Sequence, residues 1–495
     1  MGASQSDELK DMQGGLVGFN KDFVRLVFFQ LPADASPAKV LIDQLVPQLT
    51  NAYEVLAFNA LYKEVRHDRQ GDRDIIQAAW VNLWLSRQGL QRVGGTVESF
   101  PAEFQEGMAA RGETLGDIGR SAPANWEASF VGGEPDAALY LGADSEDDLN
   151  RRHDRLLEIL SANGVTPTSE QPGETRPEPN RGREHFGFKD GISQPGIHPF
   201  TTSSKVGPAS VPAGEFLVGY EDATGQISGV GVTVPLPPPS AYNPRPTPPP
   251  NTDLPAWMRN ASFVVYRKLQ QDVGGFRTSM ATAATPELNP DQLGAKLVGR
   301  WPSGAPMEHV RGEPKHLDPS LADPSSTYPN VLDDEKINDF TYDDDLDGPK
   351  VPRAAHIRKV NPRSETLPDG DRASLHRMIR RGIPYGSEFV EGSPAYGQTV
   401  EPQDDRGLLF ISYQASIERS FEFIQRNWVN QVNFQQLGDG ADPIASQATD
   451  PRPFTLPPDK HLDFNTWVFT RAGCYFVSLA LSGLSALAAP SPVDS

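Results

Sequence analysis

The chain has 495 residues, with 45 basic and 65 acidic side chains and a formal net charge of −20 at pH 7. This charge excludes a general nucleic-acid surface, because phosphates require a positive field. A single cysteine, Cys474, excludes an intrachain disulfide framework and any cysteine-rich zinc or iron–sulfur site. No apolar run is long enough for a transmembrane helix, so we expect no membrane partner.

The predicted elements alternate between strands and helices. In chain order they are a strand at 23–31, a helix at 37–49, a strand at 75–85, a helix beginning at 86–93, a strand at 137–141, a helix from 144 to 164, strands at 262–268 and 408–413, and a helix at 417–428. The second half repeats the strand-then-helix order of the first half, which favours duplication of one α+β unit. A proline-rich stretch, 234–255, predicts an extended surface loop.

Three segments combine residue types that could carry chemistry. His356 lies in an apolar context and is followed by basic residues, Ala-Ala-His-Ile-Arg-Lys. Asp190 lies in an Asp-Gly turn flanked by Phe186 and Phe188, which could desolvate its carboxylate. An arginine cluster that includes Arg380 runs into a Gly-Ile-Pro-Tyr turn, which is unusual in an acidic chain. A helix end, a plain turn and a surface histidine are the alternative interpretations of these segments.

Four motifs, taken together and in this order, resemble the dye-decolorizing peroxidases, and most closely their longer, fungal type. The motifs are Gly187-x-x-Asp190-Gly191 with the following Ile-Ser-Gln-Pro, Ala-Ala-His356-Ile-Arg-Lys, Arg380-Arg-Gly-Ile-Pro-Tyr385 and Gly407-Leu-Leu-Phe-Ile-Ser-Tyr-Gln414. The likeness extends from about Val17 to Val477. One GxxDG alone is a weak signal, whereas four motifs in the family's order are a strong one.

The resemblance implies an α+β fold of two ferredoxin-like domains, each an antiparallel sheet with helices. We expect residues 1–212 to form the N-terminal domain with the GxxDG motif, and residues 213–495 to hold most of the haem. The resemblance also implies one haem b per chain. The expected activity is oxidation of dyes and of phenolic or other aromatic compounds by hydrogen peroxide, through a ferryl intermediate.

The resemblance also assigns roles to individual residues. His356 matches the axial ligand of the haem iron, Asp190 the distal acid–base, and Arg380 the group that stabilises developing charge. The other expected positions are Arg358 at a haem propionate, Leu408 and Phe410 on the distal wall, Asp442 as the acceptor of a hydrogen bond from the ligand histidine, and Tyr385 and Trp428 in electron transfer or surface oxidation. Tyr342 is a further candidate for electron transfer, because it lies beside an acidic loop that could hold a cation. These residue types suit the chemistry, because peroxide must lose a proton at one oxygen and gain one at the other.

An acidic loop precedes His356. Asp343-x-Asp345-x-Asp347-Gly348 matches the first half of an EF-hand calcium loop, but Ala354 stands where the closing glutamate is required. The EF-hand is therefore excluded. Two interpretations remain, a looser surface site for a hard cation such as Mn²⁺ at these three aspartates, and a solvated charged loop.

Three other function classes stay open on the sequence alone. They are a chlorite dismutase-like haem enzyme, a haem carrier or sensor without turnover, and an acidic cation-binding secreted protein without haem. The Asp190 turn argues against the first, and a carrier would not require both Asp190 and Arg380. The fungal resemblance favours an extracellular protein, and a glycosylation sequon at Asn260 is only compatible with secretion, because such sequons often occur by chance. This chain shows no signal peptide, and the cytoplasm is the alternative.

Overall fold

A computed structural model describes most of the chain. The described residues are 4–18, 21–68, 76–201, 210–225, 227, 254–308, 338–363, 373–391, 405–434, 436–447 and 450–489. Apart from its last two residues, the proline-rich stretch 234–255 lies outside these ranges.

A nine-stranded sheet, in which every pairing is antiparallel, forms the centre of the molecule. Its first half has the order β4-β1-β3-β2 and its second half the order β13-β7-β10-β8, with β9 paired to β10. These strands are β1 (Phe23–Phe29), β2 (Ala79–Leu85), β3 (Ala137–Ala143), β4 (Pro167–Glu174), β7 (Ser262–Gln271), β8 (Ile379–Arg380), β9 (Ile383–Tyr385), β10 (Gly407–Gln414) and β13 (Val468–Ser478). In chain order the main strands are β1, β2, β3 and β4 in the first half and β7, β8, β10 and β13 in the second. In each half the fourth strand lies beside the first, and the third lies between the first and the second. This is the strand order of a βαββαβ, ferredoxin-like unit.

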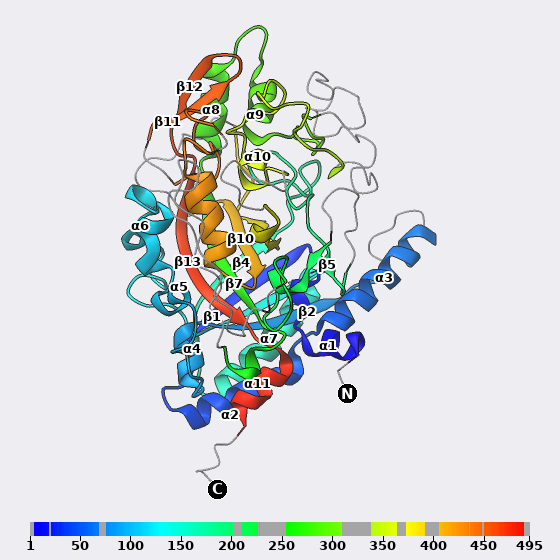
Figure 1. The fold of residues 1–495 in the computed structure, drawn as a ribbon. Helices are drawn as coiled ribbons and strands as arrows, with labels where there is room; N and C mark the ends of the chain where they lie inside the picture. The colour runs from blue at the N-terminus through cyan, green and yellow to red at the C-terminus, as the bar shows by residue number, and fades with distance from the viewer. Residues whose placement is uncertain are drawn as a thin grey trace.

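The two halves meet where β2 pairs with β13, at Leu85 and Val477. β13 is a long curved strand beside β7 (Figure 1), and all but one of its residues are buried. A strand covered on both faces shows no alternation of polar and apolar residues, so no strand is predicted there from the sequence. The predicted α+β class, with antiparallel strands and helices, is confirmed, while the domain boundary at 212/213 stays a prediction.

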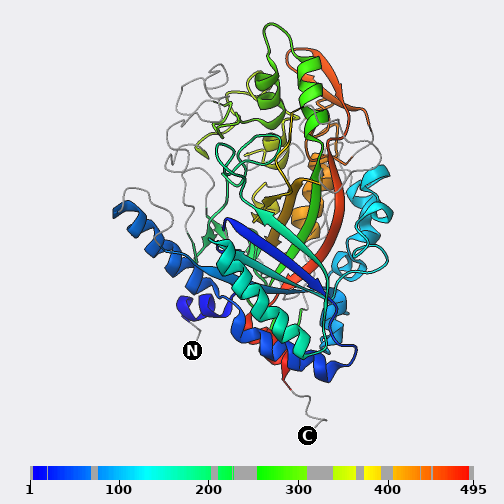
Figure 2. The same cartoon turned by 180° about the vertical axis from the view of Figure 1, so that it is seen from behind.

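The helices lie around this sheet. They are α1 (Gln5–Asp11), α2 (Ala35–Leu45), α3 (Ala52–Asp68), α4 (Arg87–Arg92), α5 (Ala102–Glu106), α6 (Gly112–Leu115), α7 (Glu146–Ala162), α8 (Val273–Ala283), α9 (Pro290–Val298), α10 (His356–Val360) and α11 (Leu481–Ala488). Helices α2, α7 and α11 gather at the end of the molecule that carries the chain termini (Figures 1 and 2). Helices α8 and α9 and the hairpin of β11 (Arg452–Leu456) and β12 (Lys460–Phe464) lie at the opposite end. A small parallel pair, β5 (Ile197–His198) with β6 (Val211–Pro212), completes the strands.

Local sequence explains where some of the helices begin and end. The N-cap Ser145 accepts a hydrogen bond from the backbone of Asp148, and the acidic first turn of α7 suits the helix dipole. The predicted helix 37–49 begins at Ala35, and its last turn is a 3₁₀ turn at Val46–Gln48, where Pro47 has no N–H to donate. None of the described helices combines the length and the apolar character needed to cross a bilayer.

The predicted helix 417–428 forms with a different geometry. It consists of two π-helical segments, η12 (Glu418–Glu422) and η13 (Ile424–Val429). The i→i−5 bonds from Glu422 to Ile417 and from Asn430 to Gln425 mark this winding. π-helical turns are rare and occur frequently at functional sites, and this one borders the cavity described next.

Candidate active site

A cavity of about 280 Å³ lies between the segment 184–195 of the first half and residues of the second half. Its wall is mostly apolar, with a smaller number of charged side chains. The apolar lining comprises Phe186, Phe188, Ile192, Leu269, Val298, Ile357, Val360, Met378, Leu408, Phe410, Phe421, Ile424, Val429, Ile444 and Val468. The predicted distal-wall residues Leu408 and Phe410 lie on β10, and Phe421 and Ile424 come from the π-helical segments.

His356 is the first residue of α10 and lines this cavity. Its Nδ1 lies 2.7 Å from Oδ2 of Asp442, a fully buried carboxylate. Backbone N–H groups of Ile444 and Ala445 donate to the other carboxylate oxygen, Oδ1, at 2.8 and 2.9 Å. Because an ionised carboxylate only accepts, Nδ1 carries the proton and Nε2 keeps its lone pair for a ligand.

Both members of this pair have shifted pKa values. Burial opposes the charge on Asp442, but the adjacent His356 and the two amides outweigh burial and lower its pKa. Burial likewise lowers the pKa of His356, and Asp442 reverses the direction, so the pKa of the imidazole is raised. The carboxylate therefore stays anionic behind the imidazole and increases its electron donation.

Asp190 and Arg380 lie in contact at the same cavity. Nη1 of Arg380 donates to Oδ1 of Asp190 at 2.9 Å, and the backbone N–H of Gly191 donates to the same oxygen at 2.6 Å. Gln194 fixes the backbone of Arg380 through two hydrogen bonds of 3.1 Å. About a third of each charged side chain is exposed, 30% for Arg380 and 35% for Asp190, and both line the cavity.

The pKa of Asp190 follows from these neighbours. Burial raises it, but Arg380, the Gly191 amide and the more distant His356 outweigh burial, so the pKa lies below its ordinary value of 3.8. Oδ2 of Asp190 accepts no hydrogen bond from any residue that the structure describes. This oxygen is therefore available to a small molecule in the cavity.

The donor set fits a haem. No group of three or more His, Cys, Asp or Glu side chains that could hold a bare metal ion occurs within the described ranges. A single imidazole in a largely apolar cavity suits a metal whose other ligands come from a macrocycle. The charged lining adds Lys189, Arg300, Arg363 and Arg377, which suit carboxylate groups on such a macrocycle.

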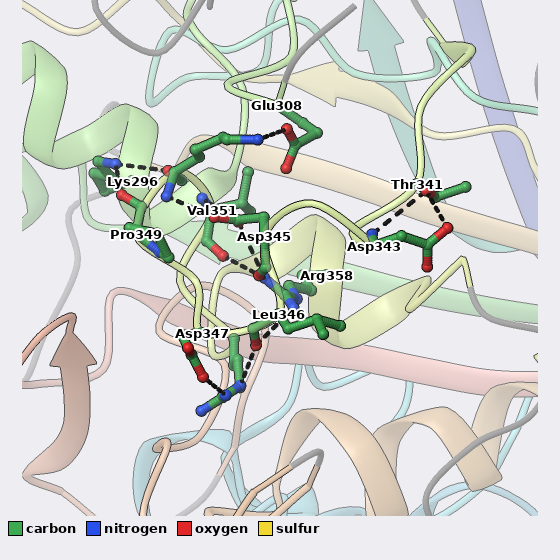
Figure 3. A network of polar contacts seen from close by, with 12 residues as sticks. Lys296, Glu308, Thr341, Asp343, Asp345, Leu346, Asp347, Pro349, Val351 and Arg358 are labelled. Carbon is green, nitrogen blue, oxygen red and sulfur yellow. Dashed lines mark hydrogen bonds and ion pairs between the residues drawn. The ribbon is translucent and has the colours of Figure 1, made fainter. Parts of the chain in front are cut away.

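Arg358 does not line the cavity, which corrects the expected contact with a haem propionate. Its guanidinium donates from Nη1 to the carboxylate of Asp345 at 3.2 Å, and to the carbonyl oxygens of Asp345 and Val351 at 2.8 Å each (Figure 3). Arg363 and Arg300 line the cavity instead. Neither residue is among the positions expected from the sequence; both lie just outside a helix, Arg300 after α9 and Arg363 after α10.

The acidic loop does not form the predicted cation site. Asp345 points inward and accepts the backbone N–H groups of Lys350 and Val351 at 2.9 and 2.8 Å (Figure 3). Asp343 bonds Thr341 instead, and Asp347 pairs with Arg353 at 2.9 Å. The three carboxylates are engaged by separate partners, so the Mn²⁺ interpretation of this loop is corrected. A charged loop organised around one buried aspartate replaces it.

The three aromatic residues expected in electron transfer are all buried. Tyr385 is 3% exposed, Trp428 is 2% exposed and Tyr342 is 5% exposed. Trp428 packs edge-on against His376, with ring centroids 5.2 Å apart, and His376 lines the cavity. The hydroxyl of Tyr385 lies 3.1 Å from Oδ1 of Asp405. None of the three is a surface site, so the expected surface oxidation does not apply to them directly.

Comparison with known proteins gives a consistent result. A family model described as "DyP dimeric alpha+beta barrel domain" matches residues 11–177, and one described as "Dyp-type peroxidase, C-terminal" matches residues 330–446. The chain is 32% identical to Peroxidase 2 of Mycetinis scorodonius, over 97% of this chain and 88% of the relative. It is 30% identical to a dye-decolorizing peroxidase of Mycena epipterygia, over 96% of this chain and 85% of the relative.

Solved structures agree with the sequence relatives. A variant of the dye-decolorizing peroxidase of Pleurotus ostreatus superimposes with a TM-score of 0.80 at 26% identity, over 97% of this chain and 99% of that chain. A dye-decolorizing peroxidase in complex with 2,6-dimethoxyphenol gives 0.76 at 31% identity, over the same shares. With matches in both halves of the chain and relatives along nearly all of it, this chain belongs to the dye-decolorizing peroxidase family, whose members are haem-dependent peroxidases.

Proposed function

We propose that this peroxidase binds one haem b per chain through His356 and oxidises phenolic and other aromatic compounds, as well as dyes, with hydrogen peroxide. Family membership already establishes a haem peroxidase that acts on dyes. The observation that supports the finer proposal most is that His356, backed by Asp442, opens onto the same cavity as Asp190 and Arg380. The complex of a relative with 2,6-dimethoxyphenol supports the phenolic substrate class.

His356 would hold the haem iron through Nε2, with Asp442 fixing the ring by its bond to Nδ1. When bound, the haem supplies the redox chemistry of its iron. Lys189, Arg300, Arg363 and Arg377 would hold its carboxylates. The apolar wall of Leu408 and Phe410 would limit water around the reacting oxygen atoms.

Asp190 would act as the proton carrier for hydrogen peroxide. Its free oxygen Oδ2 would take the proton from one peroxide oxygen and return it to the other, which then leaves as water. Arg380 cannot lose its proton at working pH and would stabilise the negative charge on the departing oxygen. The lowered pKa of Asp190 keeps the carboxylate in its basic form in acid, which suits an acidic optimum.

Because the relatives of this chain are peroxidases, we do not retain the haem carrier, the chlorite dismutase-like enzyme or the haem-free protein as alternatives. Bulky dyes are too large to enter a buried cavity, so electrons from a dye at the surface would have to cross the protein to reach the haem. Trp428 is the best-supported relay, because it touches His376 at the cavity, and Tyr385 and Tyr342 are further candidates. Being buried, all three would pass electrons on rather than contact a dye.

An extracellular location stays part of the proposal and rests on the fungal likeness alone. The Asn260 sequon adds no support, because the side chain is 5% exposed and its Nδ2 donates to Glu8 and Asp11 at 2.7 and 2.8 Å. Nδ2 is the atom that a glycan would modify. A glycan at this position would have to break both bonds.

The test is an absorption spectrum of the purified protein loaded with haem, taken before and after one equivalent of hydrogen peroxide. We expect a Soret band that changes on peroxide addition in the wild type. His356→Ala should lose the axial-ligand spectrum, whereas Asp190→Asn should keep the resting spectrum and respond far more slowly. A normal resting spectrum in His356→Ala would contradict the proposed ligand.

A further inference from the structure

The turn that presents Asp190 is folded around the carboxylate of Glu184, a residue that the proposed chemistry does not use. Oε1 of Glu184 accepts the backbone N–H of Phe188 at 2.9 Å, and Oε2 accepts that of Phe186 at 2.8 Å. Gln271, at the end of β7, donates its side-chain amide to the same Oε2. Buried backbone donors need such acceptors, and this one side chain satisfies two of them in the turn.

The backbone of Glu184 closes the same turn. Its N–H donates to the carbonyl of Phe188 at 3.0 Å, and its carbonyl accepts the N–H of Gly187 at 2.9 Å. Gly187 has a φ of 106°, a conformation that favours glycine. Nη1 of Arg176 also donates to this carbonyl at 2.6 Å, while its Nε and Nη2 hold Glu388. The turn is thus fastened to both halves of the molecule.

The turn held by these bonds ends at Asp190, the proposed acid–base residue. Phe186 stacks on Phe276 with ring centroids 4.5 Å apart, which fixes the apolar side of the turn. Two residues after Phe188, Asp190 meets Arg380. No hydrogen bond joins Glu184 to Asp190 in the described residues, so any effect of Glu184 on Asp190 passes through the backbone of the turn.

We propose that Glu184 is a positioning residue, whose two carboxylate oxygens hold residues 184–190 so that Asp190 faces Arg380 in the cavity. This inference rests on the proposed acid–base role of Asp190. A carboxylate is required because both of its oxygens accept, whereas a glutamine has one acceptor oxygen and an NH₂ group. In Glu184→Gln that NH₂ would face the N–H of Phe186 or of Phe188, and one bond would be lost.

The test compares haem-loaded wild type with E184Q, D190N and the double variant in stopped-flow reaction with hydrogen peroxide. We expect E184Q to slow the reaction about 10- to 100-fold, the range expected for a misplaced catalytic group. In the D190N background, E184Q should cause no further loss, because it acts only through Asp190. The matched control is E134Q, since Glu134 also holds a backbone N–H, that of Met108 at 3.0 Å, but does not line the cavity.

Three further readouts separate positioning from general damage. Amide hydrogen exchange in residues 184–190 should accelerate in E184Q, with or without haem. The acid limb of the peroxide rate profile should move to higher pH. Asp190 would lose its contact with Arg380 but remain buried in the cavity near His356, so its pKa would rise. Because Glu184 itself lines the cavity, the resting absorption spectrum checks for a direct effect on the haem site. It should not change, since the contact between His356 and Asp442 is untouched.

Each outcome decides between the two hypotheses. An unchanged peroxide rate in E184Q, or an equal loss in the wild-type and D190N backgrounds, would overturn the positioning role. A normal rate in D190N itself would instead overturn the acid–base role. If E184Q does not fold, Gln271→Ala removes one donor from the same carboxylate, and a smaller loss that vanishes in the D190N background is expected.

Discussion

Oδ1 of Asp190 lies 2.9 Å from Nη1 of Arg380, although 190 positions of sequence separate the two residues. The carboxylate comes from a turn of the first half of the chain, and the guanidinium comes from β8 of the second half. Neither half alone would therefore carry the proposed peroxide chemistry. The contact also sets the protonation state of Asp190.

Asp190→Asn should slow the reaction with hydrogen peroxide by about 10²- to 10⁴-fold, because an amide cannot carry the proton. Haem binding should persist, since His356 and Asp442 are unaffected. Stopped-flow absorption measures both properties. Asp343→Asn is the control, because Asp343 is exposed and bonds only its neighbour Thr341 among the described contacts. A wild-type rate in Asp190→Asn would contradict the proposed acid–base role of Asp190.

Arg380→Ala should shift the pH dependence of the peroxide reaction. In the wild type the pKa of Asp190 is lowered, so the rate should hold until the pH falls below 3.8 and then decline as the carboxylate is protonated. Without the guanidinium, only the Gly191 amide and His356 still oppose the effect of burial, so the pKa of Asp190 should be higher and the decline should begin at higher pH. Rates measured across the acid range check this. An acid limb at the same pH in both proteins would contradict it.

Asp442→Asn should raise the reduction potential of the haem iron. Asparagine is neutral, so the imidazole of His356 donates less electron density to the metal than it does beside a carboxylate. Spectroelectrochemical titration of the haem-loaded protein measures the shift. The control is Asp439→Asn, a nearby carboxylate that pairs with Arg353 and not with His356. Equal potentials in wild type and Asp442→Asn would show that the buried carboxylate does not tune the ligand.

Asp345→Asn should destabilise the protein by about 2–4 kcal/mol, because the buried guanidinium of Arg358 would lose its anionic partner. Asp343→Asn and Asp347→Asn should change the free energy of unfolding by less than about 1 kcal/mol, because Asp343 and Asp347 are exposed. Denaturant unfolding of the three variants tests the difference. Titration with Mn²⁺ should find no site that depends on all three aspartates.

Glu103→Gln should flatten the pH dependence of stability. Burial, reinforced by Glu422 and Glu418, raises the pKa of Glu103 to about 8. The folded protein therefore keeps this proton between pH 4.5 and about 8 while the unfolded chain loses it, so the free energy of unfolding falls as pH rises through this interval.

Glutamine keeps the acceptor for the backbone N–H of Glu418 and carries no charge. The difference between the unfolding free energies of Glu103→Gln and wild type should therefore grow from pH 4.5 to 8 in favour of the variant. Urea unfolding at several pH values measures it. Glu106→Gln, at a side chain that is 51% exposed, is the control. Parallel curves for wild type and Glu103→Gln would show that Glu103 titrates normally.

Several features of this protein follow from the sequence alone. The strand β1 and the helix α7 lie close to their predicted positions, because their apolar spacing and the Ser145 cap act over a few residues. Three of the four motifs contain His356, Asp190 and Arg380, and the family resemblance adds Asp442; all four residues line or back one cavity. No local pattern would have joined them, since 86 positions separate His356 from Asp442.

The contacts of individual side chains, in contrast, depend on the folded arrangement of distant segments. Arg358 turns to Asp345 and away from the cavity, and Trp428 is buried beside His376. The π-helical winding of 418–429 is likewise invisible in an apolar pattern that suits an ordinary helix. The physical reason is that burial and hydrogen-bond partners depend on distant segments that folding brings together, whereas periodicity and capping depend on neighbours along the chain.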